Sequence, residues 1–198
     1  MNPTVIFDLS EVLIYGLVGV EKSLAANLNI PETEILKCFG GDRLQKICRG
    51  EITEDVYLQE ILTLQKWDLP AEILKKSIRD NFHLEVAGTR AILLHLVKKY
   101  DVFLLSDHAR EWVTYIKSIH PFLDDFKRTF FSYELGTTKK DPRTFEKLLQ
   151  ELSCEANECW LIDDSLENVK AAASVGINAI RFTNAEQLRQ ELIEQYLW

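Results

Sequence analysis

The chain of 198 residues is 46% hydrophobic and 27% charged, a balance typical of a globular protein, and it suits one domain with an insertion better than two domains. Its net charge of -8 disfavours non-specific binding to nucleic acid or to an anionic membrane, because both partners would be repelled. The cysteines Cys38, Cys48, Cys154 and Cys159 form no CxxC pair and no Cys/His metal spacing, which argues against a disulfide framework or a zinc site.

The beginning of the sequence lacks the basic segment and apolar run of a signal peptide, and no apolar run approaches ~18 residues. We therefore expect a protein that is neither secreted nor membrane-spanning and that works in the reducing cytoplasm.

A short apolar run near the start of the chain ends abruptly in a carboxylate. Val5, Ile6 and Phe7 are typical of a strand covered on both faces, which places Asp8 at its carboxyl end. Open parallel sheets bind ligands at this edge. A single aspartate there more often caps a turn, so a chemical role for Asp8 depends on later segments converging on it.

Residues 14 to 85 carry no strand signal and are typical of a series of helices. We place the starts of these helices at prolines and at Thr53, which suit a first turn or a cap. Glycines that follow a last turn mark helix ends. The predicted helices cover residues 17–28, 31–39, 42–48, 54–67 and 70–82. A crossover between strands needs only one helix, so we interpret this block as an insertion that folds as its own bundle over the sheet.

From Val86 onward, buried strands alternate with amphipathic helices. We predict strands over residues 102–105, 129–131, 160–162 and 178–180, and helices over 91–100, 112–119, 142–152 and from 185 onward. Strands separated by such helices imply right-handed crossovers and a parallel sheet with helices on both faces. The α/β core would consist of residues 1–13 and 86–198, and the helical block of residues 14–85.

Four segments together carry a signal that none carries alone. They contain Asp8, Ser106, Lys139 and the pair Asp163-Asp164. In this order and spacing, the chain resembles the haloacid dehalogenase (HAD) superfamily, in its phosphatase branch with a helical cap, and is similar to its sugar-phosphate phosphatase members. The run from Leu161 to Val169 is the most specific part. The resemblance implies an α/β, Rossmann-like parallel sheet with a helical cap inserted after the first strand.

The resemblance also implies roles in phosphoryl transfer. Asp8 would be the nucleophile that forms an aspartyl-phosphate. Ser106 and the backbone N–H of Asp107 would hold the phosphoryl oxygens, and Lys139 would neutralise phosphate and orient the nucleophile. These positions imply catalysis by Asp8, Ser10, Ser106 and Lys139.

A magnesium ion is implied by the same resemblance. The carboxylates of Asp8 and Asp164 and the backbone carbonyl of Ser10 would hold Mg²⁺, with Asp163 and Asn168 binding or supporting it. Oxygen ligands suit this ion, and its charge would offset the repulsion between a carboxylate and a phosphate dianion.

Ser10 departs from the family pattern, because phosphatases of the family usually carry a second aspartate at this position. A serine hydroxyl is neither acidic nor basic enough to replace it, and loss of a general acid/base typically removes ~10²–10⁴ in rate. Substrates with good leaving groups would suffer less. Glu11, Asp107 and His108 are candidate substitutes, and His108 has the most suitable ordinary pKa.

The expected function is Mg²⁺-dependent hydrolysis of a small phosphorylated metabolite. The alternative is a weakened phosphate-binding or regulatory protein; a metal-free haloacid dehalogenase is more distant, since Ser10 is not aromatic and Asp163-Asp164 is retained. In the helical block, Tyr15 and Arg43 could reach substrate, although a surface salt bridge is the commoner role for such an arginine. The sequence leaves the substrate and the oligomeric state open.

Overall fold

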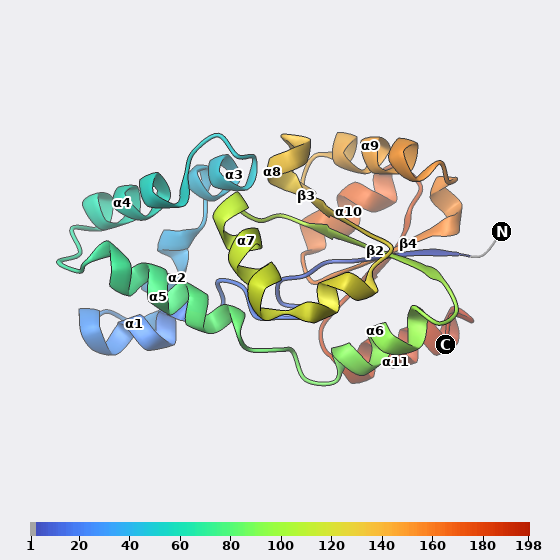
Figure 1. The fold of residues 1–198 in the computed structure, drawn as a ribbon, viewed down its shortest axis with the longest axis horizontal. Helices are drawn as coiled ribbons and strands as arrows, with labels where there is room; N and C mark the ends of the chain where they lie inside the picture. The colour runs from blue at the N-terminus through green and yellow to red at the C-terminus, as the bar shows by residue number, and fades with distance from the viewer. Residues whose placement is uncertain (1–2) are drawn as a thin grey trace.

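A computed structural model describes residues 3–198 and shows a five-stranded parallel sheet with the strand order β3-β2-β1-β4-β5 (Figure 1). The strands are β1 (Thr4–Phe7), β2 (Asp101–Ser106), β3 (Arg128–Phe131), β4 (Cys159–Asp163) and β5 (Asn178–Arg181). In the register of the sheet, Phe7 at the end of β1 lies beside Leu104 of β2 and Ile162 of β4. The predicted α/β architecture with a parallel sheet is confirmed.

Helices cover both faces of the sheet. The helices α6 (Thr89–Leu96), α7 (Arg110–Ile119) and α11 (Ala185–Glu194) pack with Val5 and Phe7, whereas α9 (Pro142–Leu152) and α10 (Leu166–Ser174) pack with Ile6. Successive side chains of a strand point to opposite faces, so the continuous apolar run of β1 fills two cores. This explains why β1 shows no polar alternation.

Five helices lie between β1 and α6 in the sequence, and the described residues between β1 and β2 include no further strand of the sheet. They are α1 (Val20–Leu28), α2 (Glu32–Phe39), α3 (Asp42–Cys48), α4 (Glu54–Gln65) and α5 (Ala71–Phe82). We call α1–α5 the helical insertion. In Figure 1 it occupies the left side, and β1 runs toward it from the N-terminal side. The carboxyl ends of the parallel strands therefore face the helical insertion.

The two connections to the helical insertion run side by side. The backbone N–H of Tyr15 donates to the carbonyl of Leu84 (2.8 Å), and the N–H of Val86 donates to the carbonyl of Leu13 (2.9 Å). This strand-like pairing satisfies backbone groups that would otherwise be left without partners where the chain leaves and re-enters the core.

Helix boundaries agree with local sequence signals at several positions. The Thr53 side chain accepts from the N–H of Val56, Asp141 caps α9 through the N–H of Arg143, and Asn184 caps α11 through the N–H of Gln187. The helix expected over 91–100 instead spans Thr89–Leu96, after Gly88 with a φ of 84°. A short helix α8 (Ser132–Leu135) and two 3₁₀ turns, Pro121–Asp125 and Ala156–Glu158, were not predicted.

All four cysteines are free, although the sulfurs of Cys154 and Cys159 lie 3.0 Å apart. Among residues 3–198, no helix is both long enough and apolar enough to cross a membrane.

Candidate active site

The strand order brings separate segments of the chain to one edge. Because β1 lies between β2 and β4, the residues that follow these three strands are neighbours at their carboxyl ends. Asp8 follows β1, Ser106 ends β2, and Asp163 ends β4. The sequence-predicted convergence of these residues is therefore present in the fold.

Lys139 joins the two strand-end aspartates. Its Nζ lies 2.6 Å from Asp8 Oδ1 and 2.6 Å from Asp163 Oδ2, and its side chain is only 1% exposed. The loop that carries Lys139 is held in place by Asp107, whose carboxylate accepts the backbone N–H of Lys139 at 3.1 Å. Thr144 of α9 supports the same loop by donating to the carbonyl of Thr138.

Negative charge exceeds positive charge at this edge. Oxygens of Asp8, Asp163 and Asp164 lie within 4.8 Å of one another, with one lysine ammonium beside them. Burial raises the pKa of Asp8 well above its ordinary value, with Lys139 opposing and the other two carboxylates adding to the rise. Burial and Asp163 also raise the pKa of Asp164. Such a cluster of oxygen atoms could hold a divalent cation, whose charge would favour the ionised carboxylates.

The pKa of Lys139 is also raised, but for a lysine this favours the charged form. Burial alone would lower its pKa, but the carboxylates of Asp163 and Asp8 raise it well above the ordinary value. Lys139 therefore stays charged at any physiological pH.

Asp163 is fixed by α10 as well as by Lys139. Its Oδ1 accepts from the backbone N–H of Ser165 (2.9 Å) and from Asn168 Nδ2 (3.0 Å). The amide oxygen of Asn168 is buried and has no hydrogen-bond partner among the described residues. Buried polar atoms of this kind are rare, so this oxygen is suited to a ligand or a bound water.

His108 bridges two serines that follow different strands. Its Nδ1 lies 2.8 Å from Ser106 Oγ and its Nε2 lies 3.1 Å from Ser10 Oγ, while the residue is 2% exposed. Burial, with the charge of Lys139, lowers the pKa of His108 to about 3. The imidazole is therefore neutral near pH 7 and cannot act there as an imidazolium acid.

The turn after Ser10 is unusually constrained. Glu11 has a φ of 61°, and its Oε1 accepts the backbone N–H groups of Gly16 (2.9 Å) and Val18 (3.2 Å). Burial raises the pKa of Glu11 to about 7, and burial raises that of Asp107 to about 6. Gly16 is needed for close approach, since a Cβ there would lie 2.5 Å from Ser10 Oγ.

A cavity of about 180 Å³ opens beside these residues. Ser10, Asp107 and His108 line one side, and Phe82 of α5 and Trp112 of α7 line another. The cavity is therefore formed jointly by the edge of the sheet, α7 and the helical insertion.

Tyr15 and Arg43 are not among the described residues that line this cavity. Tyr15 is 39% exposed and borders a separate cavity between α1 and α5. Arg43 donates to the backbone carbonyl of Cys38 at 3.3 Å, whereas the sequence favoured a surface salt bridge for this residue.

Two ties between core and helical insertion were missed by sequence reasoning. Trp112 Nε1 donates to the buried carboxylate of Glu54 at 3.0 Å, and Ser132 Oγ donates to the carbonyl of Cys48 at 2.6 Å while accepting the N–H of His108. In the sequence, Trp112 is one member of an apolar stripe and Glu54 is a first-turn acid. No local signal pairs them.

Known proteins resemble this chain along most of its length. The mouse protein "Acyl-CoA dehydrogenase family member 10" is 28% identical over 207 residues, which cover 95% of this chain but only 18% of that protein. The "D-ribitol-5-phosphate phosphatase" of Bacteroides thetaiotaomicron is 22% identical over 202 residues and 97% of each chain. A HAD family enzyme from the same bacterium, solved as a magnesium complex, superposes with a TM-score of 0.76 at 23% identity over 97% of this chain and 98% of that one.

The model of the haloacid dehalogenase-like hydrolases matches residues 3–176, which include every site residue described above. The chain therefore belongs to the haloacid dehalogenase-like hydrolase family.

Proposed function

We propose that this hydrolase is a Mg²⁺-dependent phosphatase that cleaves a small phosphorylated metabolite through an aspartyl-phosphate on Asp8. The observation that carries the proposal is the buried contact of Lys139 with Asp8 and Asp163 beside Asp164. The relative that matches this chain over 97% of both lengths is named for a sugar-alcohol phosphate, which supports a substrate of similar size.

The donor set fits magnesium. Three carboxylates and the backbone carbonyl of Ser10 are oxygen donors, which Mg²⁺ prefers, and the buried amide oxygen of Asn168 is suited to a coordinated water. Asp8, Asp164 and Ser10 would hold the ion, with Asp163 and Asn168 supporting it. When bound, Mg²⁺ would screen the phosphate charge from the attacking carboxylate.

The protein residues then divide the remaining work. The Asp8 carboxylate would attack phosphorus, while Lys139 orients the carboxylate and neutralises the phosphoryl oxygens. Ser106 Oγ and the backbone N–H of Asp107 would donate to those oxygens. Phosphoryl transfer of this kind depends mainly on positioning and electrostatics.

Residues 14–85 would act as a cap over the site. The cavity is bounded by Phe82 of the helical insertion, and Ser132 and Trp112 tie that insertion to the core. A cap would exclude water while the phosphoryl group is transferred.

A second function, a phosphate-binding or regulatory protein with weak turnover, is favoured by one observation. Ser10 occupies the position of the usual acid, and its hydroxyl contacts His108, which is neutral. Neither group supplies the ~10²–10⁴ in rate that a general acid/base typically contributes.

Phosphate release from acetyl phosphate and from a panel of sugar and sugar-alcohol phosphates separates these functions. The phosphatase proposal predicts Mg²⁺-dependent release by wild type that falls to the buffer level in Asp8→Asn. Asp101→Asn is the matched control, because Asp101 is exposed and starts β2 at the far end of the sheet. Unchanged rates in Asp8→Asn would refute the nucleophile. An inert wild type with an active Ser10→Asp variant would favour the regulatory protein.

A further inference from the structure

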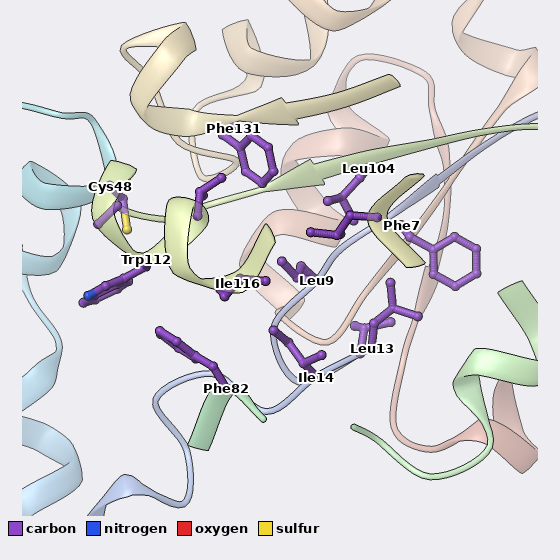
Figure 2. Packing of buried hydrophobic residues seen from close by; sticks show 14 of the residues in the cluster. Phe7, Leu9, Leu13, Ile14, Cys48, Phe82, Leu104, Trp112, Ile116 and Phe131 are labelled. Carbon is purple, nitrogen blue, oxygen red and sulfur yellow. The ribbon is translucent and has the colours of Figure 1, made fainter. Parts of the chain in front are cut away.

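Two of the four cysteines lie close enough together to react with each other. The sulfurs of Cys154 and Cys159 are 3.0 Å apart, and both thiols are free. A disulfide joins its sulfurs at about 2.04 Å, so an approach of about 1 Å would form the bond. The other two cysteines differ. Cys38 donates to the carbonyl of Glu34, and Figure 2 shows Cys48 packed among buried hydrophobic side chains. In the described part of the chain, only the first pair brings two sulfurs together.

The backbone around this pair is fixed by the fold. Cys154 lies just after the end of α9, and Cys159 is the first residue of β4. The turn between them, Ala156–Glu158, is a 3₁₀ helix. Asn178 Nδ2 of β5 donates to the carbonyls of Asn157 (2.8 Å) and Cys159 (3.3 Å), which fastens the turn to the neighbouring strand. Two groups held on one short ordered segment have a high effective concentration for each other. The reduced protein therefore holds its two sulfurs ready to bond.

The two thiols differ in their access to solvent. Cys159 is 0% exposed and belongs to the core that α9 and α10 cover, whereas Cys154 is half-buried. Burial raises the pKa of Cys159, and its hydrogen bond with Cys154 adds to the rise. A thiolate attacks a disulfide only where the two can meet. Cys154 is therefore the thiol that a molecule in solution reaches, and Cys159 is the partner that completes the bond.

The pair lies away from the candidate active site. Cys159 begins β4 and Asp163 ends it, and a strand rises about 3.3 Å per residue, which puts about 13 Å between them. The oxidation state of the pair can therefore be measured without reference to activity. Where glutathione keeps thiols reduced, cysteine pairs that do oxidise are transient and redox-sensing, not structural.

We propose that Cys154 and Cys159 form a redox-active dithiol, which a low-molecular-weight disulfide of the glutathione class oxidises reversibly to an intramolecular disulfide. The inference is independent of the phosphatase function proposed above.

The reaction has two exchange steps. Cys154 loses its proton to water, and its thiolate attacks one sulfur of glutathione disulfide, which forms a mixed disulfide and releases one glutathione thiolate. Cys159 then gives its proton to a released thiolate and attacks the Cys154 sulfur, which displaces the second glutathione as a thiolate that takes up a proton from water. The two cysteines lose two electrons, and glutathione disulfide gains them as it becomes two thiols. Excess reduced glutathione reverses both steps.

Peptide mass spectrometry of the folded wild-type protein tests the pairing. The protein is incubated with glutathione disulfide, and its remaining thiols are then alkylated. We expect the bond between Cys154 and Cys159 to exceed the glutathione adduct of Cys154 by at least about tenfold, because the second thiol is already in place. Dithiothreitol should restore both thiols. A folded protein that keeps both thiols free, or that retains glutathione on Cys154 as its main product, would overturn the inference.

Single substitutions separate the two roles. Cys159→Ala should stop the reaction at the mixed disulfide, so that glutathione stays on Cys154. In Cys154→Ser, the buried Cys159 should remain unmodified. Cys38→Ser is the matched control, because it removes another half-buried thiol and should form the disulfide as wild type does. Glutathione on Cys159 of the folded Cys154→Ser protein would contradict the assigned order of attack.

Thermal stability gives a second readout. A disulfide between residues 154 and 159 restricts the unfolded chain, so the oxidised wild-type protein should melt at least about 2 °C above the reduced protein. Cys154→Ser under the same treatment should show no such shift. Differential scanning fluorimetry measures both. An unchanged or lower melting temperature in the oxidised wild type would show that the fold must distort to form the bond, and would refute the inference that its sulfurs are held ready.

Discussion

Lys139 is a buried cation held between two buried carboxylates. Taking three charges out of water is expensive, and their mutual attraction offsets that cost only if the geometry is good. Here Nζ lies 2.6 Å from an oxygen of each partner, and Asn168 and the N–H of Ser165 satisfy the remaining oxygens of Asp163. The arrangement contributes little to stability relative to an apolar core, but removing one member leaves the others uncompensated.

Replacement of Lys139 by methionine should therefore destabilise the protein strongly. We expect the free energy of unfolding to fall by about 3–5 kcal/mol, because Asp8 and Asp163 lose their buried counter-charge. Urea denaturation measures the change. Lys140→Met is the matched control, because Lys140 is 52% exposed and pairs with exposed Glu167, and it should cost less than about 1 kcal/mol. Similar losses in both variants would show that Lys139 is not a buried counter-ion.

His108 gives the stability of the protein a specific dependence on pH. Its pKa is lowered to about 3, against about 6.5 in the unfolded chain. Between these values the unfolded chain binds a proton that the folded protein does not, so the contribution of His108 to the free energy of unfolding is lost as the pH falls from about 6.5 toward 3. We expect His108→Gln to lose less stability than wild type over this range in urea titrations without Mg²⁺.

The comparison between variants isolates this residue. Glu11 and Asp107 have raised pKa values, about 7 and about 6, so their contribution runs the opposite way, present at low pH and lost as the pH rises through those values. Both remain in the variant and cancel in the difference. His83→Gln, at an exposed histidine, should keep the wild-type dependence. Parallel curves for wild type and His108→Gln would mean that the imidazole titrates normally.

Between elements, a buried carboxylate joins the helical insertion to the core. Glu54 of α4 is 1% exposed and accepts from Trp112 of α7, while Arg79 (2.7 Å) and Lys75 (3.3 Å) of α5 pair with its other oxygen. Because Trp112 also lines the cavity, this carboxylate positions one wall of the site.

Glu54→Gln should weaken this tie without removing the side chain. We expect a loss of about 1–3 kcal/mol in unfolding free energy, since three donors lose a charged acceptor at a buried position. Glu51→Gln, which breaks an exposed pair with Arg49, serves as the control and should cost less than about 1 kcal/mol. Equal effects in thermal or urea denaturation would argue against a structural role for Glu54.

At the scale of the whole molecule, the site exists only when the sheet and the loop after α8 are assembled. Its acidic cluster draws on β1 and β4, and its cation comes from the loop between α8 and α9. A ligand of this cluster binds the folded chain and not the unfolded one, so it must stabilise the fold.

Magnesium should therefore raise the melting temperature. At about 100 times the dissociation constant, the expected gain is about 2.7 kcal/mol in the free energy of unfolding. The gain should shrink in Asp164→Asn and persist in Asp101→Asn, whose exposed side chain lies at the opposite end of β2. Differential scanning fluorimetry with and without Mg²⁺ measures it. A shift of equal size in both variants would indicate that the ion binds outside the cluster.

Much of the fold is local in origin and could be predicted. Each of the five strands of the sheet lies where a short apolar run predicts it, and Thr53, Asp141 and Asn184 cap the helices that follow them. Where the predicted elements differ from the structure, the cause is also local. Thr89 starts α6 because Gly88 before it adopts a positive φ, and the four-residue helix α8 is too short to show periodicity.

The sequence by itself determined the order of strands and helices and the residue types at the strand ends, because hydrophobic period and capping act within a few residues. The resemblance to the haloacid dehalogenase superfamily added the expectation that Asp8, Ser106, Lys139 and Asp163 converge. Only the tertiary structure decided that His108 bridges Ser10 and Ser106, that Glu54 meets Trp112, and that the ring of Trp112 packs against that of His108. These contacts join residues up to 98 positions apart, and their geometry depends on how the helical insertion packs on the core, which no local pattern encodes.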